Sequence, residues 1–423
     1  MLSCAGNDYV ETPAMDALAA EGVRFERAYC TNPVCVPSRF SLMTGRMPSA
    51  IGLKSNERSH IPEIPDVIKR NGLGHLMRRA GYEAAYGGKV HLPKLCAEDI
   101  GFNVISTNER GQLADTCATF IRQDRDRPFF LVASFINPHD ICYMTLVEHA
   151  QNEREKRLVE RGELECETLQ AALQRPQGVD EEAFFAAHCP SLPPNFEVQE
   201  EESEAVRQLL DRSPCRKKTR EAWSERRWRE HRWAYARLTE RVDRQVGRVL
   251  DALRESGRME NTLVVFTSDH GDMDGAHRLA SKIIPYEEVC RIPLIIRAPG
   301  QRRDGRVDRT HLVSNGLDLL PTFCDWAGVE PPRDLVGRSL RPLVEGEFVG
   351  DWCEGLPVES EIGRAVVTDR FKYVVYDPGA NREQFYDLEC DPGETRNALH
   401  DPAFRQDLDS LRGSFREWFG DGV

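Results

Sequence analysis

Three continuous apolar runs constrain the fold of this chain more than any other feature. They cover residues 129–135, 262–267 and 293–296. Runs of this kind are typical of strands that are buried on both faces of a sheet. Long connections separate them, as crossovers between parallel strands require. The sequence therefore predicts an α/β fold, with a large, mostly parallel mixed sheet flanked by helices.

The segments between and after these runs predict two further units. Residues 146–220 are charged and interrupted by prolines, which indicates an insertion of helices and loops over one face. A long helix is expected over 223–257. Residues 365–368 and 371–376 bracket Asp369-Arg370 as a β-hairpin, and a closing helix is expected over 408–419. We predict a main α/β domain over 1–340, which includes the insertion, and a small C-terminal α+β subdomain over 341–423.

Composition excludes several classes of protein. The chain has 423 residues, with 56 Lys and Arg against 69 Asp and Glu, for a net charge of −13. Because nucleic-acid binders usually carry a basic surface, no nucleic-acid partner is expected. The longest apolar run, 129–136, is too short to cross a membrane, so no membrane span is expected. The 13 cysteines include no C-x-x-C pair, which favours free or buried thiols over a disulfide framework.

One motif places a cysteine at the start of a predicted helix. Cys35 is followed by Val-Pro-Ser-Arg39 and, a few residues later, by Thr-Gly-Arg46. The free amides of a helix N-terminus and the two arginines would favour negative charge on this cysteine or on a bound ligand. The motif therefore indicates an oxyanion site around a reactive residue. The alternative is a buried structural cysteine beside a capped helix.

Further polar residues follow predicted strands, where open α/β sheets place their ligands. Asp269 and His270 follow the run 262–267 and suit a divalent cation, although a capped turn would also explain them. Lys89 and Lys282 are two of only nine lysines and could bind an anion. His91, His139 and His277 complete the set. The first two could transfer protons, whereas His277 could either contact the substrate or hold its loop.

Together these motifs resemble those of the type I sulfatases, in the alkaline-phosphatase-like superfamily. The resemblance rests on Cys35 to Arg46, on Gly88-Lys89-Val90-His91, on Pro138-His139 and on Ser268-Asp269-His270-Gly271 with His277 and Lys282. Later segments, such as 337–343 and 385–392, extend it over nearly the whole chain. It implies the alkaline-phosphatase/sulfatase-like fold and the hydrolysis of a sulfuric ester on a carbohydrate or another organic sulfate.

The resemblance also implies the parts of the site. A formylglycine-generating enzyme would convert Cys35 to formylglycine, whose hydrate attacks sulfur. Ca²⁺, less often Mg²⁺, would be bound by Asp269, His270 and the side chain at position 35. Arg39 would activate the nucleophile, and His139 or Lys282 would assist the departing alcohol. His91 would deprotonate the second hydroxyl and so release sulfate. Lys89, His139, His277 and Lys282 would bind the substrate.

One departure from the family pattern concerns the N-terminus. Sulfatases of this type open with an apolar strand that ends in adjacent acidic residues, which bind the same cation. Here residues 1–7 are loop-like, and Asp8 and Asp16 do not follow a strand. We therefore expect Met1 to be an internal methionine, the centre of the sheet to contain a gap, and metal binding and activity of this exact chain to be weak.

Two alternatives to a sulfatase remain open. A phosphonate monoester hydrolase or phosphodiesterase could use the same motif, because sulfuryl and phosphoryl groups are both tetrahedral. A truncated pseudo-sulfatase without activity is the other. Specificity is expected to lie in 146–220 and the C-terminal hairpin, where Phe184, Phe185, Phe196 and Trp223 either stack on a sugar or pack in the core. Without a signal peptide, the protein would be cytoplasmic, or periplasmic or extracellular if a leader precedes Met1.

Overall fold

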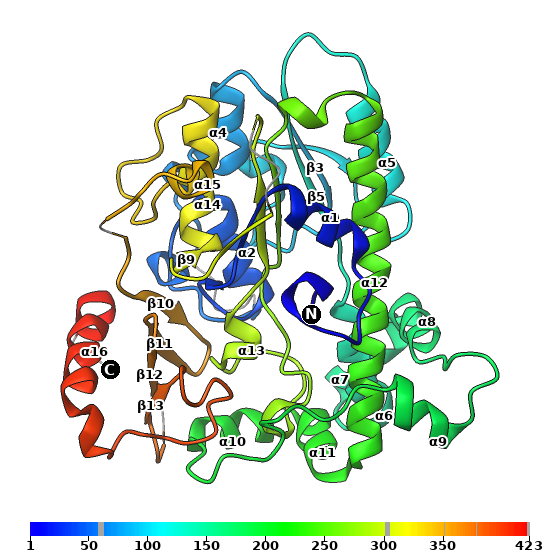
Figure 1. The fold of residues 1–423 in the computed structure, drawn as a ribbon, viewed down its shortest axis with the longest axis vertical. Helices are drawn as coiled ribbons and strands as arrows, with labels where there is room; N and C mark the ends of the chain where they lie inside the picture. Colours follow the sequence, from blue (N-terminus) through cyan, green and yellow to red (C-terminus); the bar gives the residue numbers. More distant parts are fainter. Residues whose placement is uncertain (58–62, 301–304, 351, 378, 421–423) are drawn as a thin grey trace.

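Two separate sheets form the centre of the main domain in the computed structural model, which describes residues 1–57, 63–300, 305–350, 352–377 and 379–420 (Figure 1). The first sheet has the order β4-β3-β5 and is entirely parallel. The second has the order β6-β7-β1-β8. Their bounds are β1 Val23–Phe25, β3 Glu83–Gly88, β4 Asn103–Ser106, β5 Phe129–Ser134, β6 Val264–Thr267, β7 Leu294–Arg297 and β8 Arg306–Asp308. A short parallel pair, β2 Ala28–Tyr29 and β9 Val313–Ser314, lies beside them.

The three predicted strands exist, but one of their relative directions was predicted wrongly. β7 runs antiparallel to both β6 and β1, whereas we expected parallel crossovers. The connection between β6 and β7 explains the difference. It holds loops and only one short α-helix, α13 (Glu287–Cys290), so it contains no helix long enough to carry the chain back across the sheet.

The predicted gap at the centre of the sheet is confirmed. β5 and β6 are edge strands of the two sheets, and both line one cavity of about 880 Å³. All the residues of β5 and β6 are partly exposed, whereas those of β7 are buried. The prediction that residues 129–135 and 262–267 form strands buried on both faces is therefore wrong. Their facing edges have no strand between them among the described residues, so one continuous sheet does not form.

Helices cover both faces of the two sheets. On one face lie α1 (Pro13–Glu21), α5 (Leu113–Arg122) and the long α12 (Glu225–Glu255), which runs along one side of the molecule in Figure 1. The other face is covered by α2 (Cys35–Thr44), α4 (Leu73–Arg79) and α14 (Asn315–Ala327). Successive residues of β5 alternate between the two layers, as expected for a strand: Leu131 packs in the first and Val132 in the second.

The insertion is helical in its described part, as predicted. Its helices are α6 Cys142–His149, α7 Glu153–Arg161, α8 Glu163–Ala172, α9 Glu181–Ala183, α10 Glu204–Asp211 and α11 Pro214–Ala222, and residues 146–220, all of which the structure describes, contain no strand. Phe184, Phe185, Phe196 and Trp223 are all buried and pack against other aromatic rings. The core-packing alternative is therefore the one that the structure supports for these aromatic residues.

The C-terminal region forms an antiparallel sheet of four strands, β10 (Leu356–Glu359), β11 (Gly363–Val367), β12 (Phe371–Tyr376) and β13 (Glu383–Asp387). The predicted hairpin is confirmed, with Ala365 opposite Val374, and α16 (Arg405–Phe419) packs on this sheet. α15 (Arg341–Glu345) instead packs in the core of the main domain, whereas α3 (Asp66–Arg70) packs near α2. The boundary at residue 340 stays a prediction.

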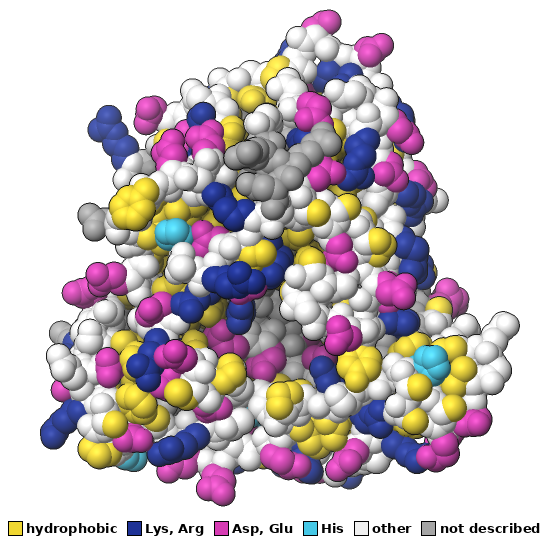
Figure 2. Space-filling view, in the orientation of Figure 1, with side chains coloured by type: hydrophobic (Ala, Val, Ile, Leu, Met, Phe, Trp, Pro, Cys, Tyr) yellow, Lys and Arg dark blue, Asp and Glu magenta, His cyan; other side chains and the backbone are white. Residues whose placement is uncertain are grey.

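The surface shows no concentration of one charge on the face drawn in Figure 2, where basic and acidic side chains are interspersed. All 13 cysteines are free thiols in the structure, which agrees with the prediction. None of the described helices has both the length and the apolar composition needed to span a bilayer.

Candidate active site

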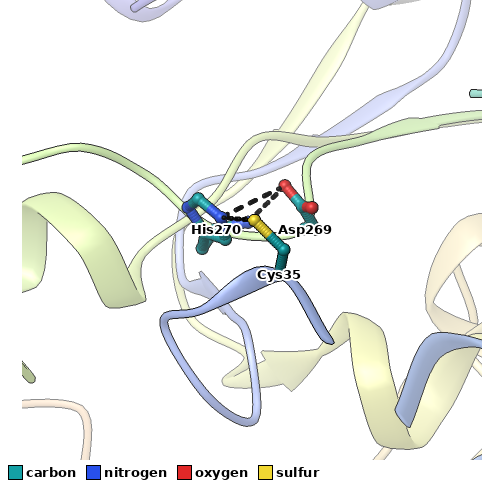
Figure 3. Close-up of side chains that lie close together, drawn as sticks. All are labelled: Cys35, Asp269 and His270. Atoms are coloured by element: carbon teal, nitrogen blue, oxygen red, sulfur yellow. Dashed lines mark hydrogen bonds and ion pairs between the residues drawn. The ribbon is translucent and has the colours of Figure 1, made fainter. Parts of the chain in front are cut away.

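Cys35 lies at the centre of a buried group of polar side chains. It is the first residue of α2 and is 1% exposed. Its Sγ lies 3.2 Å from Nε2 of His270, 3.3 Å from Nζ of Lys282 and 3.6 Å from Nζ of Lys89. Figure 3 shows Cys35 meeting Asp269 and His270, which come from the loop after β6. The structure therefore brings together Cys35, Lys89 and three residues of the segment 269–282, three parts of the chain that are far apart in the sequence.

The positive charge around Cys35 comes from side chains more than from helix amides. We expected free amides at the start of α2, but the Val36 amide donates to Oδ1 of Asn56 and Pro37 has no N–H. Burial acts to raise the pKa of the Cys35 thiol, but the charges of Lys282, His270 and Lys89 outweigh it and hold that pKa well below its usual range. An oxyanion at this position is thus stabilised by the neighbouring lysines.

The two lysines differ in their surroundings. Burial lowers the pKa of Lys89, which lies near the fixed charge of Arg39. Burial also opposes the charge of Lys282, but the negative charges of Cys35, Cys142 and Asp269 raise its pKa. Lys89 is placed by Gly88, where an added Cβ would lie 2.2 Å from the Ser134 carbonyl oxygen, so β3 and β5 can approach closely only with glycine there.

Asp269 is held by an arginine from α2. Nε of Arg39 donates to Oδ2 of Asp269 at 2.8 Å, and its Nη1 donates to the Lys89 carbonyl and to Oγ of Ser134, both at 2.8 Å. Burial acts to raise the pKa of Asp269, but His270 and Arg39 hold it well below its usual range. Arg39 therefore positions the Asp269 carboxylate in its ionised form, and also joins α2 to the ends of β3 and β5.

The hydrogen bond of His270 fixes its tautomer. Nδ1 of His270 lies 2.7 Å from the carbonyl oxygen of Gly271, which can only accept, so Nδ1 carries the proton. Nε2, the other ring nitrogen, lies 3.2 Å from Cys35 Sγ and is the atom that could bind a metal. Gly271 itself is required here, because an added Cβ would lie 1.9 Å from the Glu288 carbonyl oxygen.

The donor set fits a divalent cation. One ligand atom each from Cys35, Asp269 and His270 lies within 4.8 Å of the others, and Oδ1 of Asp269 is 3.7 Å from Nε2 of His270. A carboxylate with an imidazole suits a hard or borderline cation. Ca²⁺ takes about six to eight oxygen ligands, so these three residues would supply only part of its shell. The predicted weakness of metal binding stays a prediction.

His139 lies in the turn η5 (His139–Ile141) after β5 and lines the central cavity. Burial, followed by the charges of Lys282 and Lys89, holds the pKa of His139 well below its usual range. The turn is held by a residue that sequence reasoning missed. Nη2 of Arg110 donates to Oδ1 of Asp140 at 2.7 Å and to Oε1 of Glu165 at 3.1 Å, which links the turn to α8 of the insertion.

The other two candidate histidines are placed differently. His91 is partly exposed, and no described contact joins it to Cys35, so its role in deprotonation stays a prediction. His277 is completely buried and stacks on Tyr286 with ring centroids 4.2 Å apart. Its backbone N–H donates to the Asn195 carbonyl at 2.7 Å. This position favours the loop-holding role of His277 over contact with substrate.

His277 should make the protein sensitive to acid. Burial lowers its pKa to about 4, so the folded protein prefers the neutral ring, whereas the unfolded chain gains a proton near pH 6.5. Its contribution to stability is complete above pH 6.5 and is lost as the pH falls from 6.5 towards 4, by about 3 kcal/mol in total. In urea unfolding over this range, the His277→Gln variant should show a flatter pH dependence than the parent. The exposed His188→Gln control should not, and parallel curves for parent and His277→Gln would contradict this.

The comparisons with known proteins agree with this geometry. The family model Sulfatase matches residues 1–329, and the model N-sulphoglucosamine sulphohydrolase, C-terminal, matches residues 275–418. The Delta 4,5-hexuronate-2-O-sulfatase of Bacteroides thetaiotaomicron is 30% identical over 94% of this chain and 81% of that protein. The chain belongs to the sulfatase family. Members of this family use formylglycine and a divalent metal, which agrees with the grouping of Cys35 with Asp269 and His270.

Solved structures support the fold over nearly the whole chain. A 2-O GAG sulfatase is similar with a TM-score of 0.79 and 28% identity, covering 96% of this chain and 86% of that one. The phosphonate monoester hydrolase of Agrobacterium radiobacter has a TM-score of 0.70 and 22% identity, covering 98% of this chain and 93% of that one. At that identity, the second likeness shows a common fold alone.

Proposed function

We propose that this chain hydrolyses a sulfate ester carried by a carbohydrate, with Ca²⁺ as the resident cation. The observation that carries the proposal is the convergence on Cys35 of two lysines and an Asp-His pair. A maturation enzyme would convert Cys35 to formylglycine. Formylglycine would then supply an oxygen nucleophile in place of the thiol, and the cation would supply a Lewis acid beside it.

The chain's own residues account for binding and charge stabilisation. Nζ of Lys89 and Nζ of Lys282 both face position 35, so they can bind sulfate oxygens and offset negative charge in the transition state. Nζ of Lys282, 3.3 Å from Cys35 Sγ, is placed to hydrogen-bond to the leaving oxygen. Arg39 fixes the Asp269 carboxylate, and the Gly271 carbonyl fixes the tautomer of His270, so neither ligand needs to reorient when a cation binds.

The relatives favour a carbohydrate substrate. Two of the three similar proteins named above are described as a hexuronate 2-O-sulfatase and a 2-O GAG sulfatase, and each matches more than nine-tenths of this chain. The alternative activity on phosphonates has support from the fold alone. A sulfated sugar is therefore the first substrate class to test, with an aryl phosphonate as the competitor.

The test is sulfate release by the protein after co-expression with a formylglycine-generating enzyme. A panel of sulfated mono- and disaccharides, an aryl sulfate and an aryl phosphonate would be assayed with Ca²⁺, with Mg²⁺ and with chelator. We expect sulfate release from at least one sugar, higher activity with Ca²⁺ than with Mg²⁺, and little phosphonate hydrolysis. Faster cleavage of the phosphonate than of every sulfate would overturn the assignment, and no turnover at all would favour the pseudo-sulfatase.

A further inference from the structure

Arg216 stands out among the arginines of the insertion because it has no partner. It lies near the start of α11 and is partly buried, yet it makes no hydrogen bond or ion pair with any residue that the structure describes. Neighbouring arginines are paired: Nη1 of Arg212 lies 3.9 Å from Oε1 of Glu361, and Nη1 of Arg154 lies 3.8 Å from Oε1 of Glu57. The charge of Arg216 is thus not neutralised by a hydrogen bond or ion pair with any residue that the structure describes.

The position of Arg216 is close to the candidate active site. α11 packs against α6, whose first residue, Cys142, lines the central cavity together with His139 and Lys282. Sγ of Cys142 lies 3.8 Å from Oγ of Ser281, the neighbour of Lys282 in sequence. Burial raises the pKa of the Cys142 thiol, and the charges of Lys282 and Arg216 both act against that rise. Arg216 and Lys282 therefore both act to lower the pKa of the same thiol, that of Cys142.

The turn between β10 and β11 in the C-terminal sheet also comes near Arg216. Glu361, in the turn between β10 and β11, lies within the electrostatic reach of Arg212 and Arg216, although burial is the main cause that raises its pKa. The preceding residue, Ser360, donates from Oγ to the carbonyl oxygen of Ile283, which directly follows Lys282. Arg216 thus interacts with two segments, each of which contacts a sequence neighbour of Lys282.

The backbone that carries Arg216 is firmly held. The Cys215 amide donates to Oε1 of Glu155 at 3.1 Å, and Pro214 begins the helix. One turn further along α11, Nη2 of Arg220 pairs with Oε1 of Glu202 at 2.6 Å. Because the helix is anchored at both positions, the guanidinium of Arg216 is presented from a rigid element.

A second anionic group on the substrate would give Arg216 its partner. The single charge of a sulfate ester is matched by Lys89 and Lys282, and a planar guanidinium is suited to bidentate binding of a carboxylate or a second sulfate. We propose that Arg216 binds this second anionic group, so that the substrates are sulfated sugars with a further acidic group. This inference rests on the proposed function and names its substrate class.

The experiment compares Arg216→Met with Lys218→Met, which removes an exposed cation from the same helix. The substrates are a sulfated uronic acid, its methyl ester, a disulfated sugar and a neutral monosulfated sugar. We expect Arg216→Met to lower kcat/KM on the uronic acid, the disulfated sugar or both by roughly 10- to 100-fold, mainly through KM, and to leave the other two substrates unchanged. Lys218→Met should change kcat/KM on none of them. If the carboxylate is the group bound, methyl esterification of the uronic acid should lower kcat/KM of the parent by the same factor as Arg216→Met lowers it on the free acid.

The outcomes separate this inference from the proposed function. An equal loss on neutral and acidic sugars, or no loss on either acidic sugar, would overturn the assignment of Arg216 and leave the sulfatase activity standing. A loss on the disulfated sugar alone would identify a second sulfate, rather than a carboxylate, as the group bound. If the parent hydrolyses no sulfated sugar at all, both proposals fail together.

Discussion

Replacing Cys35 with alanine is expected to lower kcat/KM for sulfate release on the order of 10⁴-fold or more. Removal of a nucleophile leaves only the contribution of binding and charge stabilisation, here from Lys89, Lys282 and the cation. The measurement is sulfate release under single-substrate conditions, with the residual rate compared to the uncatalysed rate.

A second buried cysteine provides the control for this change. Cys324, on α14, is completely buried in the core and lies outside the polar group, so Cys324→Ala should cost stability but leave kcat/KM close to that of the parent. If Cys35→Ala kept more than about a hundredth of the parent's activity, position 35 would not be the nucleophile.

Replacing Asp269 with alanine should have the second largest effect, on both stability and activity. The side chains of Arg39 and Asp269 are only 11% and 14% exposed, and Lys89 and Lys282 lie near the same carboxylate. Removing one partner of a buried ion pair leaves an uncompensated charge, which typically costs about 3–5 kcal/mol. We expect a loss of free energy of unfolding in this range with chelator present, so that loss of a metal ligand does not contribute. The same change should abolish any dependence of activity on Ca²⁺.

Asp334→Ala is the matched control for this ion pair. Arg46 pairs with Asp334 at 2.7 Å, but Asp334 is 67% exposed, so water can replace it as a partner of the guanidinium. Its loss should cost about 1 kcal/mol or less. If the two variants lost the same free energy of unfolding in chelator, the Arg39–Asp269 ion pair would not behave as a buried pair, and this prediction would be wrong.

Sequence reasoning located the site because the site residues follow strands. Lys89 follows β3, His139 lies in the first turn after β5, and Asp269 and His270 come after β6, so the carboxyl ends of these strands meet at one edge. Cys35 joins them because α2 begins at this edge. The arrangement of these residues could therefore be predicted from their position along the chain, together with the resemblance of their motifs to a known family.

The contacts that support the site could not be predicted in this way. Arg110 and Asp140 are 30 residues apart and Asn56 reaches the Val36 amide across a loop, and no local pattern marks either pair. The antiparallel direction of β7 depends on how the long loop after His270 folds back. Arg216 was one arginine among many in a charged segment, and only its lack of a described partner and the packing of α11 against α6 set it apart.

The cavity between β5 and β6 shows the limit of apolar patterns. The apolar runs 129–135 and 262–267 correctly predicted two strands, but an apolar run does not indicate whether a neighbouring strand is present in the sheet. The gap was expected from the family resemblance alone, and the structure has it, with a volume of about 880 Å³. Weak metal binding and low activity of this chain follow from the same argument and stay predictions.

The most direct test of the central claim relates activity to the chemical state of residue 35. Preparations made with different amounts of the maturation enzyme would be assayed for sulfate release from the best sulfated sugar. Mass spectrometry of the peptide that contains residue 35 would give the converted fraction in each preparation. The account predicts that the rate is proportional to this fraction and falls to background when conversion is zero. A rate that does not depend on conversion would contradict it.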